Sequence, residues 1–247
     1  MTVLHLADEG EAADLAAFLS RLLHYDRSAA VRLQAAGTAL AVFGRPPSFE
    51  VLAVRAVRLA KPYENGLDVT LDVTVSAGEL LETVDETAAT AGVPGAVTGP
   101  PWAGMLPPRG GWRTEPGLPA PDELRTLVAA AVAEFRSRTG ELAPERRTRA
   151  ELDRIGREIW SRTVGDTGLP VRAVHAAQSL GFLRPTGAYE AGQAEASGAP
   201  EVSGASGASG EDAPRLFSSG AWLRLRTPFG SVALRRAGSG ALGISVR

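Results

Sequence analysis

The residues of this chain best suited to chemistry are arginines close to its C-terminal end. Residues 213–247 contain six arginines and no aspartate or glutamate, whereas the whole chain has 26 basic and 28 acidic side chains. Arg224 and Arg226 alternate with Leu223 and Leu225, so in an extended strand both guanidinium groups project from one face. Because guanidinium groups bind phosphate through paired hydrogen bonds, this pattern predicts contact with a polyanion.

A second basic stretch lies earlier in the chain. Residues 136–184 contain ten arginines against six acidic residues, while residues 1–120 contain 9 basic and 14 acidic side chains. The near-neutral total therefore combines an acidic N-terminal part with a basic C-terminal part. Such an asymmetry is typical of proteins whose basic part binds nucleic acid.

Residue patterns typical of an enzyme are missing. The three histidines, His5, His24 and His175, lie in no metal-binding or catalytic motif. Asp68 and Asp72 on one predicted strand are about 13 Å apart, farther than the roughly 5–9.5 Å that separates the carboxylates of glycosidases. We therefore expect that the protein is not an enzyme.

A glycine motif at 238–243 matches the dinucleotide fingerprint G-x-G-x-x-G. That fingerprint requires a following helix and an acidic residue about 20 positions later, and only four residues follow here. The chain also contains no cysteine, which excludes thiolate metal sites and disulfides. We expect no cofactor and no metal.

The first part of the chain has the patterns of an α+β unit, which we assign to residues 1–88. Apolar residues at helical spacing predict a helix over 11–24. Strict alternation of apolar and polar residues predicts a strand over 67–75, and Ser76 and Glu79 follow it at the spacing of a helix capping box. Further strands of the same antiparallel sheet are predicted over 31–35, 38–44 and 50–59.

Residues 89–120 are rich in proline and glycine and contain Trp102 and Trp112. The composition predicts an extended linker. Its tryptophans have two open interpretations: they dock on a neighbouring surface of this chain, or they form a recognition site for a protein partner.

A helical domain is predicted over 121–184. Apolar spacing indicates helices over 122–138, 149–162 and 170–180, and Thr148 and Glu151 form a second capping box. Residues 186–214 are a low-complexity Gly/Ala/Ser/Glu segment that we expect to be disordered. Residues 215–247 then contain a basic β-hairpin, with strands over 221–227 and 230–236 that we expect to pack on the helical domain.

The order of three helices followed by a hairpin resembles a winged helix, in architecture only. In that family the third helix lies in the major groove of DNA and the wing contacts phosphate. The resemblance implies that the exposed residues of the third helix and the arginines of the hairpin contact DNA: Arg172, His175, Gln178, Ser179, Arg224, Arg226, Arg235 and Arg236. The alternative is a helical domain closed by a hairpin whose arginines are only solvated.

The sequence indicates no membrane association. Residues 87–108 carry no charge, but several prolines interrupt them, and residues 1–10 lack the basic start of a secretion signal. Only one of the 26 basic residues, Lys61, is a lysine, a bias that favours a GC-rich genome. We therefore expect a bacterial cytoplasmic protein.

These observations predict an α+β protein with an N-terminal antiparallel sheet, flanking helices and a winged-helix-like C-terminal part. The predicted function is that of a non-enzymatic regulatory protein that contacts double-stranded DNA through its basic C-terminal part. The alternative is a scaffolding or interaction protein without nucleic-acid binding, in which the N-terminal sheet or the segment around Trp102 and Trp112 meets a protein partner.

Overall fold

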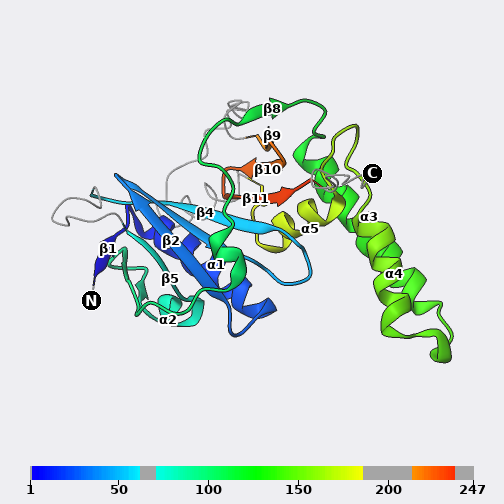
Figure 1. Cartoon of the computed structure of the whole chain (residues 1–247), viewed down its shortest axis with the longest axis horizontal. Helices are drawn as coiled ribbons and strands as arrows, with labels where there is room; N and C mark the ends of the chain where they lie inside the picture. The colour runs from blue at the N-terminus through cyan, green and yellow to red at the C-terminus, as the bar shows by residue number, and fades with distance from the viewer. Residues whose placement is uncertain (1, 62–70, 186–212, 237–247) are drawn as a thin grey trace, which may run out of the picture.

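The computed structural model describes residues 2–61, 71–185 and 213–236 (Figure 1). Helices and antiparallel strands are mixed along the chain, which confirms the predicted α+β class and the C-terminal hairpin. Three predicted features lie wholly or partly outside the described residues. They are residues 67–70 of one predicted strand, residues 186–212 of the low-complexity segment, and the glycine motif at 238–243.

Antiparallel strands from both parts of the chain form one large sheet, called the main sheet below. Among the described residues its strand order is β5-β2-β3-β4-β11-β10-β9-β8. The N-terminal strands are β2 (Ala30–Ala36), β3 (Ala39–Gly44), β4 (Leu52–Arg58) and β5 (Asp72–Ser76). The C-terminal half of the sheet consists of β8 (Arg113–Glu115), β9 (Arg215–Ser219), β10 (Trp222–Thr227) and β11 (Gly230–Arg235).

The predicted C-terminal hairpin is present as β10 and β11, and it joins the two halves of the main sheet. Ser231 pairs with Val54, and Ala233 pairs with Leu52, so β11 extends the N-terminal sheet in addition to packing on the helical region. Gly230 begins β11 with a φ of +152°, and a Cβ atom at this position would lie 2.5 Å from the ring of Phe182. Only glycine therefore allows the turn to approach the helical region so closely.

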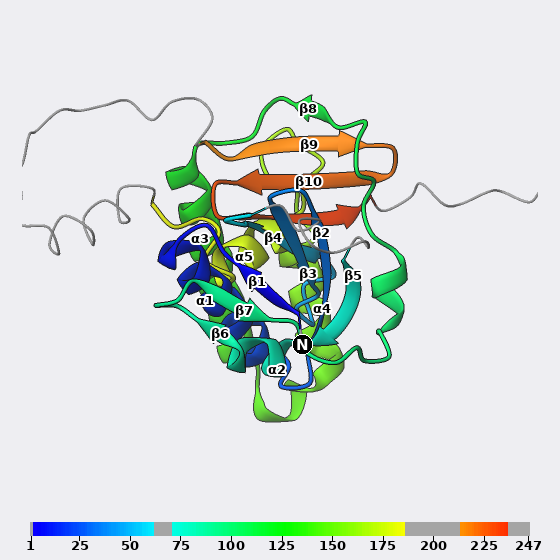
Figure 2. The same cartoon turned by 90° about the vertical axis from the view of Figure 1, so that its left-hand side faces the viewer.

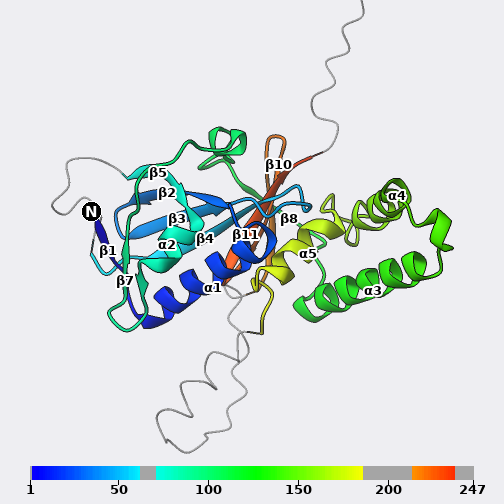
Figure 3. The same ribbon diagram turned by 90° about the horizontal axis from the view of Figure 1, so that it is seen from below.

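Helices cover one face of the main sheet, where α1 and α5 lie on the same side (Figure 3). On that face Leu223 and Leu225 of β10 are almost fully buried, in one core with apolar residues of α1 and α5. The helices are α1 (Glu9–Tyr25), α2 (Ala77–Glu82), α3 (Pro121–Gly140), α4 (Arg149–Trp160) and α5 (Val171–Ser179). Helices α3 and α4 form a hairpin that extends away from the sheet (Figure 1).

Both predicted capping residues begin helices. Ser76 accepts a hydrogen bond from the backbone N–H of Glu79, and Thr148 accepts one from that of Glu151, each at 3.3 Å. These contacts satisfy amides that have no partner within the helix. Local side-chain chemistry thus determines where α2 and α4 start.

The segment 89–120, predicted as an extended linker, contains short elements that join both sheets. Strand β7 (Thr90–Gly92) pairs with β1 (Val3–His5) and β6 (Val84–Asp85) in a small second sheet, and β8 forms the last strand of the main sheet. A short 3₁₀ helix, η1 (Pro101–Gly104), lies between them, and a second, η2 (Pro144–Arg146), connects α3 and α4.

A buried cluster of ion pairs connects the N-terminal part to the hairpin turn. The Arg55 guanidinium lies 3.1 Å from Glu11 Oε2 and 3.0 Å from Asp14 Oδ2, and it donates a hydrogen bond of 2.8 Å to the backbone oxygen of Phe229. Arg184 reaches the other oxygen of Asp14 at 2.6 Å. Because the Arg55 side chain is only 7% exposed, these carboxylates are needed to compensate its charge.

Candidate nucleic-acid interface

An open pocket of about 460 Å³ lies on the face of the main sheet opposite α5, where β4, β11, β10 and β9 meet. Among the residues that the structure describes, three arginines and no carboxylate line it. The lining residues are Val54, Ala56, Ala213, Arg215, Arg224, Arg226, Thr227, Pro228, Gly230 and Ser231. Figure 2 shows the strands β8 to β11 side by side.

Strand register places these arginines together. Arg226 of β10 lies directly opposite Arg215 of β9, and Arg224 lies opposite Phe217. Residues opposite each other in an antiparallel pair project from the same face, while Leu223 and Leu225 project into the core. The alternation seen in the sequence therefore separates the charged side chains of β10 from its apolar ones.

Arg224 is held in a defined position at the centre of this face. Its Nε donates a hydrogen bond of 2.9 Å to Ser231 Oγ, and its guanidinium carbon lies 5.8 Å from the centre of the Trp112 ring. Burial, followed by the positive charge of Arg226, lowers the pKa of Arg224 below its usual value. In the part of the chain that the structure describes, no carboxylate pairs with Arg224 or Arg226. A bound anion would compensate both charges.

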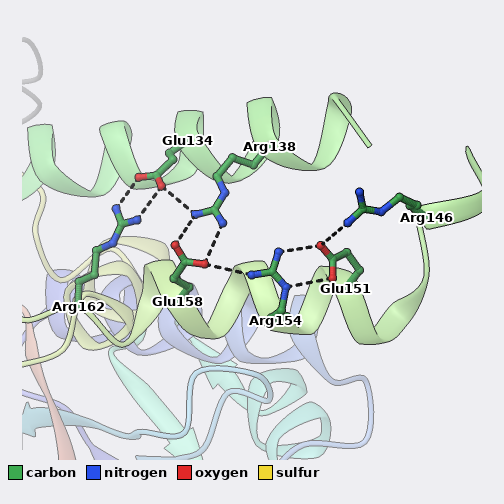
Figure 4. A network of polar contacts seen from close by, with 7 residues as sticks. All are labelled: Glu134, Arg138, Arg146, Glu151, Arg154, Glu158 and Arg162. Atoms are coloured by element: carbon green, nitrogen blue, oxygen red, sulfur yellow. Dashed lines mark hydrogen bonds and ion pairs between the residues drawn. The ribbon is translucent and has the colours of Figure 1, made fainter. Parts of the chain in front are cut away.

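Arg138, Arg154 and Arg162, which lie between α3 and α4 or just after α4, are in contrast paired with glutamates. Figure 4 shows them alternating with glutamates between the two helices. Glu134 accepts hydrogen bonds from Arg162 at 2.5 and 2.7 Å, and Arg138 bridges Glu134 and Glu158. These contacts, that of Arg162 foremost, lower the pKa of Glu134 to about 2. The charges of Arg138 and Arg162 are already compensated by these glutamates, so the two arginines are poorly suited to bind an external anion.

The predicted third-helix residues lie on the other face of the sheet. His175 stacks on Trp160 with ring centres 4.7 Å apart, its ring centre is 5.2 Å from that of Phe49, and burial lowers its pKa. Arg172 Nε lies 3.4 Å from Glu50 Oε2, whereas Gln178 is exposed. The structure therefore does not bring these residues onto one surface with Arg224 and Arg226.

A second pocket of about 420 Å³ lies beside Arg172 and Trp160. The loop on its rim contains Ser48 and Glu50, both with positive φ angles of 73° and 54°. Its charged lining residues balance, since Glu50 and Asp153 accompany Arg157 and Arg172. This pocket has no excess positive charge for a polyanion.

Arg235 and Arg236, the last two arginines predicted to contact DNA, differ in how their charges are compensated. Arg235 is exposed and lies opposite Trp222, on the same face as Arg224. Arg236 pairs with Glu115 at 2.9 Å. Arg235 thus extends the basic face, while the charge of Arg236 is compensated within the chain.

The predicted partner-binding tryptophans contact this chain's own sheet. Trp102 packs against Phe43, Leu52 and Val54. The indole N–H of Trp112 donates a 3.0 Å hydrogen bond to the backbone oxygen of Pro108. These contacts match the first of the two interpretations, in which the tryptophans dock on a neighbouring surface of this chain.

Sequence reasoning did not identify Arg215 as part of the basic face. The five residues of β9 follow the low-complexity segment and show no clear alternation of polar and apolar residues. Their position is determined by pairing with β10, and no local pattern indicates it.

No group of three or more His, Asp or Glu side chains that could hold a metal ion occurs among the described residues.

None of the helices in the described ranges is long and apolar enough to cross a membrane.

Comparison with known protein families divides the chain close to the middle of the proline-rich segment. Residues 1–104 match a family described as a domain of unknown function (DUF8010), and residues 107–239 match one described as a domain of unknown function (DUF8185). No curated protein matches the chain. The second match contains the whole basic face of the sheet and more than half of the chain, which therefore belongs to the DUF8185 family.

Proposed function

We propose that this protein is a non-enzymatic regulatory protein of the bacterial cytoplasm that contacts DNA through the arginines of its C-terminal strands. The observation that carries the proposal is the pocket in which Arg224 and Arg226 lie together with no carboxylate among the described lining residues. A phosphate group supplies the compensating charge and accepts the paired hydrogen bonds that guanidinium groups donate.

The proposal differs from the winged-helix expectation in the surface that contacts DNA. His175 is packed between aromatic rings, and Arg172 faces Glu50. The hairpin and β9 therefore supply the contacts without the third helix. Backbone phosphates, which carry no sequence information, are the groups that such arginines bind.

The experiment uses fluorescence anisotropy to measure how a labelled DNA of 20 nucleotides binds at a series of NaCl concentrations. We expect binding at about 50 mM NaCl. A plot of the logarithm of the binding constant against the logarithm of the salt concentration should have a slope of roughly −0.7 to −0.9 for each phosphate contacted. The double variant Arg224→Gln/Arg226→Gln should reduce the slope by about 1.4–1.8 and weaken binding at least roughly tenfold at low salt.

A matched control removes the same charge elsewhere. Arg136 and Arg149 are exposed residues of α3 and α4, so Arg136→Gln/Arg149→Gln changes net charge equally and should leave affinity nearly unchanged. The proposal fails if wild-type protein does not bind at 50 mM NaCl, or if both double variants lose affinity equally.

A further inference from the structure

Aromatic side chains share the basic face of the C-terminal strands. Trp222 lies opposite Ser219 on one side and Arg235 on the other, and Phe217 lies opposite Arg224. The register therefore places aromatic groups beside guanidinium groups over β9, β10 and β11. We call this surface the arginine–aromatic face: Trp112, Arg215, Phe217, Trp222, Arg224, Arg226 and Arg235.

The exposure of these side chains suits ligand contact. Arg215, Arg226 and Arg235 are exposed, and Phe217, Trp222 and Trp112 are half-buried. A half-buried ring keeps one face fixed against the protein and leaves part of its surface accessible. Arg224 beside the Trp112 ring adds a fixed positive charge to the same surface.

The shape of the face is poorly suited to a DNA duplex. The helices α1 and α5 pack on the opposite side of the sheet (Figure 3), and the short helix η1 lies on this side, where Trp102 covers Leu52 and Val54. Among the described residues, no α-helix is available on this face to enter a groove. The major groove of B-form DNA is about 12 Å wide and admits one helix or a two-stranded ribbon. Four strands at a spacing of about 4.8 Å span roughly 14 Å, and β4 continues the sheet beyond β11. The face therefore cannot enter the groove.

A single strand has no such restriction, because its bases are free to stack on protein side chains. Aromatic rings on an open sheet are a recurrent platform for unpaired bases, and arginines beside them follow the phosphates. Arg224 lies opposite Phe217, and Arg235 lies opposite Trp222, so this face can contact a base and a neighbouring phosphate together.

We propose that the arginine–aromatic face binds single-stranded nucleic acid. Arg224 and Arg226 contact the phosphates, while Trp222 and Phe217 stack on bases. This inference rests on the proposed function, since it specifies which form of DNA the same arginines bind.

The experiment compares three labelled ligands in 50 mM NaCl: a 20-residue single strand of mixed sequence, the same strand paired with its complement, and an abasic strand of equal length. We expect the single strand to bind at least about tenfold more tightly than either of the others, since more than one base stacks. The abasic strand retains the phosphates and lacks the bases, so its loss of affinity measures stacking.

Substitutions separate stacking from charge. Trp222→Leu should weaken binding of the normal single strand by roughly 5- to 100-fold, the range for one stacked base, and should leave binding of the abasic strand unchanged. Phe217→Leu serves the same purpose if Trp222→Leu does not fold, as judged by thermal melting. Tyr25→Leu on α1, on the opposite side of the sheet, is the matched aromatic control and should have no effect.

Each result has a distinct meaning. If the duplex binds as tightly as the single strand, or if Trp222→Leu weakens the normal and abasic strands equally, the inference is overturned and the proposed DNA contact stands. If no ligand binds at 50 mM NaCl, the proposed function fails as well.

Discussion

The arginines between α3 and α4 and those on the arginine–aromatic face are the same residue type in opposite environments. Between the helices, Arg138, Arg154 and Arg162 lie within 3.5 Å of glutamate oxygens. On the sheet, Arg224 and Arg226 have no such partner among the described residues, and the charge of Arg226 is close enough to lower the pKa of Arg224. The charges of the first set are compensated within the protein, while those of Arg224 and Arg226 are not compensated by any described carboxylate.

This difference shows that a count of charges along a segment does not measure the charge available to a partner. Residues 136–184 contain ten arginines against six acidic residues, yet several of these arginines are paired across the helical hairpin, one of them with Glu134 just outside the range. On the sheet face, Arg224 and Arg226 lie in a pocket with no carboxylate among its described lining residues. Substitutions that neutralise arginines of the helical hairpin or of the sheet face distinguish a role in stability from a role in binding.

The largest effect is expected for the buried member of the paired class, Arg55. Substitution Arg55→Ala leaves Glu11 and Asp14 without this partner in a buried site and removes the hydrogen bond to Phe229. We expect the free energy of unfolding in urea to fall by about 3–5 kcal/mol. Arg58→Ala, at a side chain that is 71% exposed, should cost less than about 1 kcal/mol. Equal losses would contradict the distinction between buried and exposed pairs.

The next effect concerns acid titration of the helical hairpin. The pKa of Glu134 lies at about 2, below its ordinary value of 4.5, mainly because Arg162 donates hydrogen bonds to it. A lowered carboxyl pKa contributes stability above the unfolded pKa, and this contribution is lost as pH falls from 4.5 toward 2. Arg162→Gln should raise the pKa of Glu134 toward 4.5 in a carbon-13 NMR titration. An unchanged pKa would show that Arg138 alone holds the carboxylate.

A smaller effect is expected for Arg138→Gln, which breaks exposed pairs with Glu134 and Glu158. The melting temperature should fall by a few degrees in dilute buffer. The difference from wild type should become smaller in 1 M NaCl, where the Debye length falls to about 3 Å. A deficit of the same size at high salt would indicate lost packing instead of lost ion pairing.

The smallest effect on stability is expected for Arg226→Gln. Arg226 is exposed, lies beside two other arginines and pairs with no carboxylate in the described part of the chain. Its neutralisation should change the free energy of unfolding by no more than about 0.5 kcal/mol, whereas the proposed function expects it to weaken DNA binding. A clear loss of stability in thermal or urea unfolding would mean that Arg226 belongs to the paired class.

The elements with a local signal were predictable from sequence. Apolar spacing indicated the helices, and Ser76 and Thr148 marked two helix starts because their side chains act on amides three residues away. Strands β1, β6, β7, β8 and β9 were missed because they have two to five residues, too few for a periodic pattern. Their formation depends on partners that are distant in the sequence.

The candidate site was predictable only in part for the same reason. The alternation around Arg224 placed it correctly beside Arg226 on one strand face. The sequence did not show that Arg215 lies opposite Arg226, because register between strands is not a local property. Nor did it show that His175 and Arg172 pack against Trp160 and Glu50, which lie on other elements.

The pairing of β11 with β4 has a consequence for the order of events during synthesis. Val54 leaves the ribosome long before its partner Ser231, by about 10–35 s at typical bacterial and eukaryotic rates. During this interval one edge of β4 presents unpaired backbone groups, a template for association with other chains. A nascent chain arrested before residue 230 should therefore bind chaperones or aggregate, and completion of the hairpin should end that exposure.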